Sequence, residues 1–160
     1  MNQLDPSCNG LRLLDAAERE MRPPRILLVD DDAEMRNILE QILSEEGYEV
    51  VLAEDGFDLL DRVGDTWLEA EAFDLVLSDV RMPGCTGLDA LEALREEDWA
   101  TPVLFMTAFG SRRPGERLDA REAERLGAEI LDKPFELGEL LERVRRLVPP
   151  DRYAEGWSSR

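Results

Sequence analysis

Short apolar runs alternate along the chain with longer stretches in which apolar residues recur every three or four positions. An apolar run of about four to eight residues is typical of a strand that is buried on both faces of a parallel sheet. These runs predict strands within residues 25–32, 48–56, 73–80, 101–108 and 129–132.

The intervening stretches have the period of amphipathic helices. Residues 33–47 predict a helix that ends at Gly47, with an inward stripe of Met35, Ile38, Leu39, Ile42 and Leu43. Residues 136–148 predict a helix that ends before two prolines, with an inward stripe of Leu137, Leu140, Leu141, Val144 and Leu147. Between them we expect helices at 57–72 with a break at Gly64, at 88–99, and from Glu116 onward.

A strand followed by a helix, five times over, predicts an α/β fold. We expect a doubly wound, five-stranded parallel sheet with helices on both faces. Residues 25–148 would form this domain, residues 1–24 an N-terminal extension with a short helix, and residues 149–160 a short polar C-terminal tail. Ligands of such sheets bind at the carboxyl ends of the strands.

Composition and charge narrow the range of functions. The formal net charge is −18 and the pI is about 4.3, so we expect no nucleic-acid partner and no contact with anionic membranes, because both need a basic face. No apolar run reaches the roughly 20 residues of a membrane span, and the N-terminus lacks the pattern of a signal peptide. Cys8 and Cys85 form neither a metal-binding nor a disulfide pattern, which favours a reducing, cytoplasmic location.

The histidine and lysine content also limits the chemistry of the chain. The chain has no histidine, so any phosphohistidine in its chemistry must belong to a partner. It has a single lysine, Lys133, among 19 basic residues. A compact ammonium on a flexible stem fits a crowded phosphoryl site, whereas a planar guanidinium needs room for two bonds. We therefore expect Lys133 to act at such a site.

The ends of the predicted strands bring reactive side chains to one edge of the sheet. Asp30 and Asp31 follow the first strand, Asp79 and Thr107 lie at the ends of the third and fourth, and Lys133 follows the fifth. Carboxylate oxygens suit Mg²⁺. A carboxylate can also attack phosphorus and form an aspartyl phosphate, while a metal ion and an ammonium spread the charge of the transferred group.

Four motifs in this order resemble the receiver domains of two-component response regulators, over residues 25–148. They are LLVDDD with Asp30 and Asp31, DLVLSDVRMPG with Asp79, VLFMTA with Thr107, and DKPF with Lys133. The resemblance implies a flavodoxin-like sheet with the strand order 2-1-3-4-5. It also implies that Asp79 is the phosphoacceptor, that Thr107 binds the phosphoryl group, and that Lys133 pairs with Asp79 or its phosphoryl group.

The resemblance implies a Mg²⁺ site as well. Asp31 would be a direct ligand, Asp30 would support the metal, and Asp79 and the backbone carbonyl of Arg81 would complete the set. The bond between Lys133 and Pro134 would be cis, as in the family.

The implied function is that of a signalling protein rather than an enzyme, one that assists only its own phosphorylation and dephosphorylation. A sensor histidine kinase or a histidine phosphotransfer protein would supply the phosphoryl group, and a protein partner would receive the signal. The chain ends soon after its last predicted helix, so we expect a stand-alone receiver. A homodimer would use the fourth helix, the fifth strand and the fifth helix.

The sequence also departs from the family pattern, mainly where receivers pass on their signal. Ile130 stands near the place of the usual aromatic switch residue, Cys85 and Thr86 replace the usual residues after the acceptor, and the stretch from Thr107 to Gly127 is longer than usual. The arginines between residues 112 and 125 interleave with acids, which favours a solvated helix with internal ion pairs over a docking surface for an acidic partner.

Two other interpretations stay open. The D-x-D within VDDD is similar to that of haloacid-dehalogenase-type phosphatases, with Asp30 as the nucleophile and Asp32 as the acid. Without that role, Asp32 is expected to cap the helix that follows it. A degenerate receiver that acts as a phosphorylation-independent scaffold is the other alternative. The identity of the phosphorylated aspartate separates these interpretations.

Overall fold

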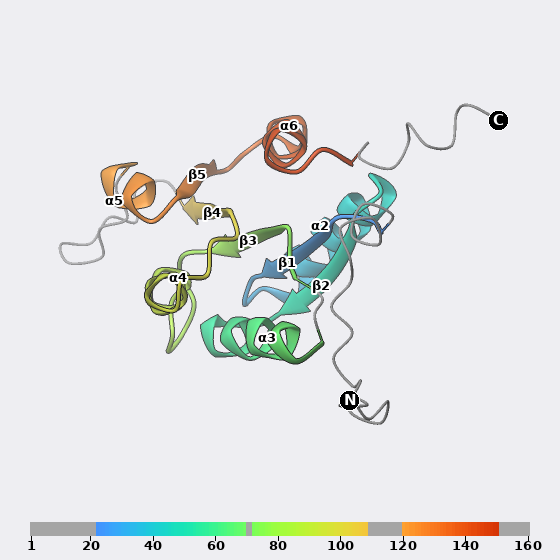
Figure 1. Ribbon diagram of the computed structural model, residues 1–160. Coiled ribbons are helices and arrows are strands. Elements are labelled where there is room, and N and C mark those ends of the chain that lie inside the picture. Colours follow the sequence, from blue (N-terminus) through green and yellow to red (C-terminus); the bar gives the residue numbers. More distant parts are fainter. Residues whose placement is uncertain (1–21, 70–71, 109–119, 151–160) are drawn as a thin grey trace, which may run out of the picture.

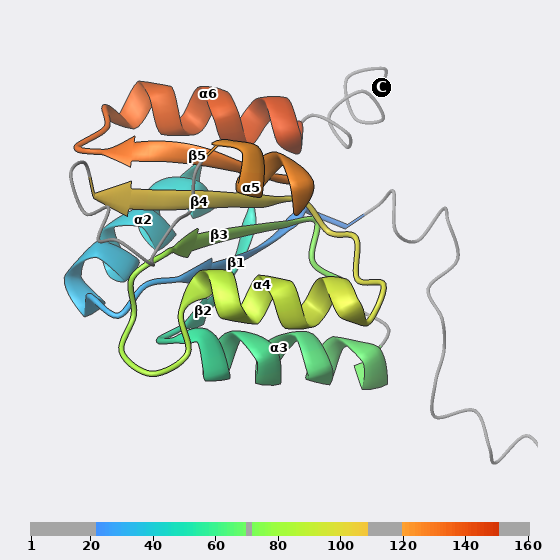
Figure 2. The ribbon, with the colours of Figure 1, turned by 90° about the vertical axis from the view of Figure 1, so that its left-hand side faces the viewer.

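Five parallel strands form one sheet at the centre of the protein. The computed structural model describes residues 22–69, 72–108 and 120–150. The strands are in the order β2-β1-β3-β4-β5, which confirms the predicted fold and strand order. Their bounds are β1 Arg25–Val29, β2 Glu49–Ala53, β3 Leu75–Asp79, β4 Val103–Ala108 and β5 Ala128–Lys133. The arrowheads point to the same edge of the sheet (Figure 2).

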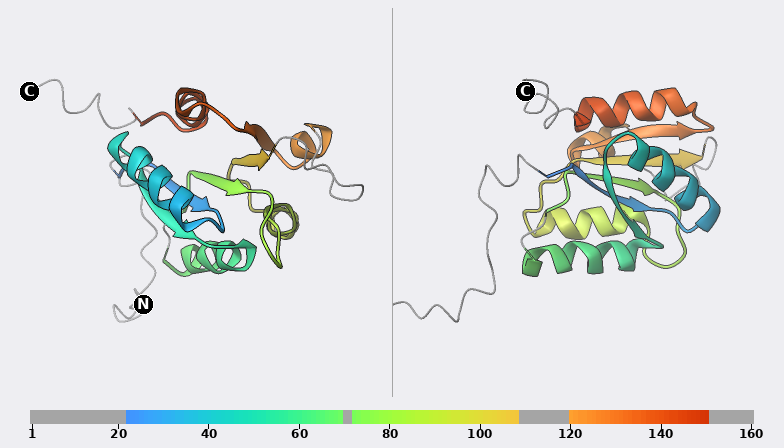
Figure 3. Two further views of the ribbon diagram at one scale, coloured as in Figure 1. Left: turned by 180° about the vertical axis from the view of Figure 1, so that it is seen from behind. Right: turned by 90° about the vertical axis from the view of Figure 1, so that its right-hand side faces the viewer.

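Helices cover both faces of this sheet (Figure 1). They are α2 Ala33–Glu45, α3 Gly56–Glu69, α4 Gly87–Glu96, α5 Ala120–Arg125 and α6 Leu137–Leu147. Figure 2 shows α3, α4 and α5 in front of the sheet, and the right panel of Figure 3 shows α2 on the opposite side. None of the helices within the described ranges combines the length and the apolarity needed to cross a membrane.

Two separate apolar cores explain why the central strand β1 is apolar at four successive positions, 26–29. Successive side chains of a strand point to opposite faces, so both faces of a covered sheet must be apolar. In β1, Leu27 and Val29 pack with α3, α4 and α5, whereas Ile26 and Leu28 pack with α2 and α6. All five residues of β1 are buried.

Three details of the predicted helices are wrong. The helix α3 runs through Gly64 without a break. An exposed glycine costs a helix only about 1 kcal/mol relative to alanine, and the burial of Leu59 and Val63 outweighs that cost. Ile38 and Leu137 do not face inward, because they are 49% and 43% exposed. The buried residues of α2 are Leu39 and Leu43, and Leu137 lies at the very start of α6.

The ends of the helices follow the local sequence. The Asp32 side chain accepts hydrogen bonds from the N–H groups of Glu34 and Met35, which confirms it as the N-cap of α2. Thr86 and Asp89 form a reciprocal capping box at the start of α4. The predicted helix in residues 1–24, the start of the helix at Glu116 and the tail beyond residue 150 lie outside the described residues.

The guanidinium of Arg95 joins the C-terminal ends of α4 and α5. Arg95 donates hydrogen bonds to the carbonyls of Leu126, Trp99 and Thr101, and its guanidinium lies 5.5 Å from the centre of the Trp99 ring. The Leu126 carbonyl directly follows α5, so this contact holds the C-terminal end of that helix.

Candidate functional site

The carboxyl ends of the strands bring the predicted acids and the lysine together. Asp30 follows β1 directly, Asp79 is the last residue of β3, and Lys133 is the last residue of β5. One carboxylate oxygen each from Asp30, Asp31 and Asp79 lie within 4.8 Å of one another. The parallel sheet produces this arrangement, because each of its strands ends at the same edge.

Asp30 is the buried member of the acidic cluster, with 1% of its side chain exposed. Its Oδ1 accepts a hydrogen bond of 2.9 Å from the N–H of Asp32, whereas its buried Oδ2 accepts none within the described ranges. Burial raises the pKa of the Asp30 carboxyl, and the charges of Asp79 and Asp31 raise it further. The N–H of Asp32 and the charge of Lys133 act in the opposite direction.

Lys133 bridges two of the three carboxylates. Its Nζ lies 3.3 Å from Asp79 Oδ2 and 3.5 Å from Asp30 Oδ2. One ammonium cannot balance three carboxylates, so the cluster keeps an excess of negative charge. The peptide bond between Lys133 and Pro134 is cis, as the resemblance implied.

The cluster fits a Mg²⁺ ion by the chemistry of its donors. Hard oxygen ligands, an uncompensated negative charge and a buried carboxylate oxygen without a hydrogen bond are the features that a small divalent cation would satisfy. Asp31 is exposed and makes no hydrogen bond or ion pair with the part of the chain that the structure describes, so its carboxylate is free to take a ligand.

The backbone around Asp79 is tightly packed, whereas its carboxylate is accessible. Asp79 Oδ1 accepts a hydrogen bond of 3.0 Å from the N–H of Arg81, and the Ser78 hydroxyl donates one of 2.9 Å to the Asp79 carbonyl. Gly87 packs so closely against that carbonyl that a Cβ atom there would lie 2.5 Å from its oxygen. The side chain of Asp79 is 14% exposed. The main chain of Asp79 is therefore fixed by its neighbours, while part of its carboxylate is accessible to solvent.

Of the remaining predicted residues, Thr107 lies near the same edge, whereas Ile130 lies in the middle of β5. Thr107 is half-buried, and its partner on β5 is Asp132. The next pair along the two strands is Ala108 with Lys133. Its hydroxyl makes no hydrogen bond within residues 22–69, 72–108 and 120–150. Ile130 is half-buried and packs against the core on the α3, α4 and α5 side of the sheet.

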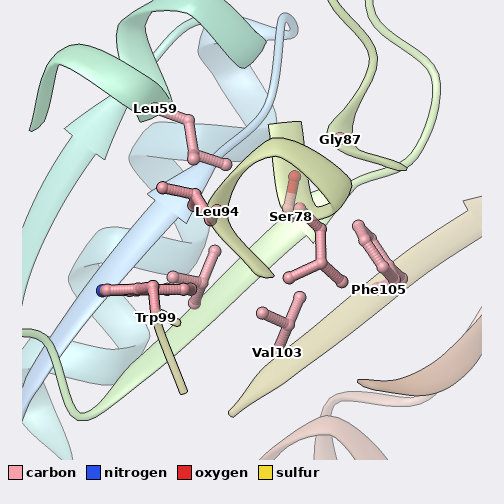
Figure 4. A pocket seen from close by; sticks show the side chains of 9 residues that line it. Leu59, Ser78, Gly87, Leu94, Trp99, Val103 and Phe105 are labelled. Atoms are coloured by element: carbon pink, nitrogen blue, oxygen red, sulfur yellow. The ribbon is translucent and has the colours of Figure 1, made fainter. Parts of the chain in front are cut away.

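A small cavity lies beneath α4, close to β3. Figure 4 shows Leu59, Leu94, Trp99, Val103 and Phe105 around it, with Ser78 and Gly87 also in its lining. Its volume of about 10 Å³ is room for roughly one water molecule, and most of its lining is apolar. A phosphorylated substrate cannot enter it, so the chemistry belongs to the open edge of the sheet.

The sequence analysis missed Arg36, which lies against the acidic cluster. Its Nη1 donates a hydrogen bond of 2.6 Å to the main-chain carbonyl of Asp30, and its side chain is 12% exposed. The available signal was its place four residues after the N-cap Asp32, one helical turn from the predicted site.

Comparisons with known proteins agree with this geometry. The model of the response regulator receiver domain matches residues 26–145. The transcriptional regulatory protein CpxR of Escherichia coli K12 is 40% identical over 132 residues, which make up 82% of this chain and 52% of CpxR. The chain spans about half the length of the curated relatives it matches.

Two solved structures show the same fold. The response regulator TrrA of Thermotoga maritima, in complex with Mg²⁺ and BeF, has a TM-score of 0.64 and 32% identity over 78% of this chain and 99% of TrrA. A complex of the histidine kinase ThkA with TrrA matches with a TM-score of 0.62 and 31% identity, over 78% of this chain and 98% of the matched chain. The chain therefore belongs to the family of response regulator receiver domains.

Proposed function

We propose that this chain accepts a phosphoryl group on Asp79 from a phosphohistidine of a partner, in a reaction that depends on Mg²⁺. The observation that carries the proposal is the cluster of three carboxylates within 4.8 Å, with Lys133 Nζ 3.3 Å from Asp79 Oδ2. The 160 residues contain no histidine, so the donor histidine must lie outside them.

The geometry supports a direct displacement at phosphorus. A carboxylate oxygen of Asp79 forms the new O–P bond, and the P–N bond of the partner's phosphohistidine breaks, with its electron pair returning to the imidazole. Lys133 lies where it can hold a phosphoryl oxygen, and Thr107 is placed at the same edge to bind another. Asp30, Asp31, Asp79 and the carbonyl of Arg81 would hold Mg²⁺, which would offset the charge of the transferred group.

Asp79 suits the role of the nucleophile better than Asp30 does. The Asp30 side chain is 1% exposed, whereas that of Asp79 is 14% exposed. Asp32, the acid of the phosphatase interpretation, is already engaged as the N-cap of α2. These contacts count against the phosphatase alternative. The scaffold alternative predicts that the chain takes up no phosphoryl group.

The partners and the setting are part of the same proposal. The ThkA–TrrA complex supports a histidine kinase as the donor, and a histidine phosphotransfer protein has the same chemistry. We propose residues 25–148 as the receiver, a protein partner or a homodimer through α5, β5 and α6 as the output, and a cytoplasmic setting without DNA contact by this domain. The match to about half of a transcriptional regulator makes the activity of any longer protein a separate proposal.

The experiment is intact-mass analysis after incubation with Mg²⁺ and acetyl phosphate. We expect one phosphoryl adduct, lost in Asp79→Asn and after chelation of the metal, and retained in Asp132→Asn, which removes an exposed carboxylate next to Lys133. An adduct mapped to Asp30 would support the phosphatase. No adduct at any donor or metal concentration would support the scaffold and refute the proposal.

A further inference from the structure

Arg36 is a cation beside the acidic cluster that contacts none of the cluster's carboxylates. It is the fourth residue of α2, and its side chain is 12% exposed. Its Nη1 donates a hydrogen bond of 2.6 Å to the main-chain carbonyl of Asp30. Its Nη2 lies 3.6 Å from the Glu54 carboxylate, which is 76% exposed and lies just after β2. The guanidinium therefore links the ends of β1 and β2 to the first turn of α2.

The carbonyl that Arg36 holds belongs to the peptide unit that joins Asp30 to Asp31. The orientation of this peptide unit sets the direction in which the Asp31 side chain leaves the backbone. No described residue makes a hydrogen bond or ion pair with the Asp31 carboxylate, so among the described contacts only those of the main chain help to place it. A hydrogen bond from a charged donor is among the stronger ones in proteins.

Few other contacts hold this turn. The N–H of Asp30 donates to the carbonyl of Ala53 at 3.3 Å, and the N–H of Asp32 donates to Asp30 Oδ1 at 2.9 Å. The second of these bonds uses Asp30 Oδ1 and leaves Oδ2 for a cation. The bond from Arg36 reaches the main chain and leaves both carboxylates available. It can therefore stay unchanged when a cation binds, and its donor is charged.

We propose that Arg36 is a positioning residue for the metal site, which fixes the Asp30–Asp31 peptide so that both carboxylates face the position of the cation before it binds. This inference rests on the proposed Mg²⁺ site. Like charges at close range would otherwise turn the exposed Asp31 away from Asp30 and Asp79. Residues that orient metal ligands typically change metal affinity by about 10- to 100-fold when they are replaced.

The test is the Mg²⁺ affinity of the full chain, measured by isothermal titration calorimetry without any phosphodonor. Arg36→Met keeps the apolar stem and removes the guanidinium, and we expect it to weaken Mg²⁺ binding by about tenfold. Arg36→Lys, which keeps the charge but not the fork, should give an intermediate value. Arg62→Met is the matched control, because Arg62 is 46% exposed, pairs with Asp58 one turn away and should leave the affinity unchanged.

A second readout separates positioning from a change in charge. In the metal-free protein, hydrogen exchange of the amides at residues 31–34 should be faster in Arg36→Met than in the wild type, whereas exchange in α6 should not change. If Arg36→Met does not fold, the comparison of Arg36→Lys with the wild type carries the same test.

The outcomes distinguish this inference from the proposed function. A wild-type chain that binds no Mg²⁺ and accepts no phosphoryl group would refute both. A wild-type chain that binds Mg²⁺, together with an Arg36→Met variant of equal affinity and equal exchange, would overturn the role of Arg36 and leave the phosphoacceptor intact.

Discussion

Replacement of Gly87 by alanine should displace the end of β3, where Asp79 lies, through a single added methyl group. Gly87 is the first residue of α4, and no unusual backbone angle requires a glycine there. The constraint is space. A Cβ atom at this position would lie 2.5 Å from the Asp79 carbonyl oxygen, 2.9 Å from Ser78 Oγ and 3.1 Å from Phe105 Cε1.

The magnitude follows from two opposing effects. Alanine is preferred over glycine in a helix by up to about 1 kcal/mol. Real Cβ atoms essentially never approach another atom closer than 3.0 Å. The contact of 2.5 Å must therefore lengthen by at least about 0.5 Å, through a shift of either α4 or β3. Such overpacking costs about 1 to 3 kcal/mol. We expect a net destabilisation of about 1 to 2 kcal/mol, or a melting temperature lower by roughly 3 to 6 °C.

Thermal and urea denaturation followed by circular dichroism would measure this effect. Gly64→Ala is the matched control, because a Cβ at Gly64 meets nothing within 4 Å and lies inside α3. That variant should gain about 1 kcal/mol. Phosphorylation from acetyl phosphate should fall in Gly87→Ala only, since the clash is with the carbonyl of Asp79, the proposed phosphoacceptor. A Gly87→Ala protein as stable and as readily phosphorylated as the wild type would refute the reasoning.

Three further predictions concern charged residues. Asp30→Asn should stabilise the metal-free protein at neutral pH, because burial raises the pKa of the Asp30 carboxyl, and it should weaken Mg²⁺ binding. Because the pKa of Asp30 is raised in the folded state, the wild type regains this stability as the pH falls through that raised pKa, so urea denaturation should show the difference shrinking in acid. Asp32→Ala removes the cap of α2 and should cost about 1 kcal/mol by the same measurement. Arg95→Met should cost about 2 kcal/mol and speed hydrogen exchange in α5, whereas Arg62→Met, at a 46% exposed position in α3, should change neither. Equal exchange in α5 of the two variants would contradict the contact between Arg95 and Leu126.

The fold and the composition of the site could be predicted because they depend on periodicity and on where the strands stop. Apolar runs marked the strands, and a parallel sheet sends the ends of all its strands to one edge. Asp30, Asp79 and Lys133 therefore had to meet, although the lysine is separated from Asp79 by 54 positions in the chain. The N-cap at Asp32 was predictable for a local reason, since its side chain bonds within its own turn.

The rest depended on contacts that periodicity does not encode. The sequence DDD does not say which acid is buried, and only the packing of the sheet edge separates Asp30 from the exposed Asp31. Gly64 resembles a helix breaker, but the burial of its neighbours overrides its propensity. Ile38 shares the helical period of the buried stripe and still lies at its outer edge, because α2 contacts the sheet over a narrow strip. The contact between Arg95 and Leu126 spans 31 positions and has no local signature.

The position of Lys133 gives the protein a chemical property of its own. It is the only side-chain amine in the chain, and it lies between the carboxylates of Asp30 and Asp79. An acylating reagent therefore has one ε-amine to modify, and acylation there removes the cation that, among the described residues, bridges those two carboxylates. The rate at which the ε-amine is modified therefore reports on Lys133 alone. Modification should be slow when a ligand or a phosphoryl group engages the ammonium, and fast when neither does. On the proposed mechanism, one acyl group on this single residue should lower the phosphorylation of Asp79.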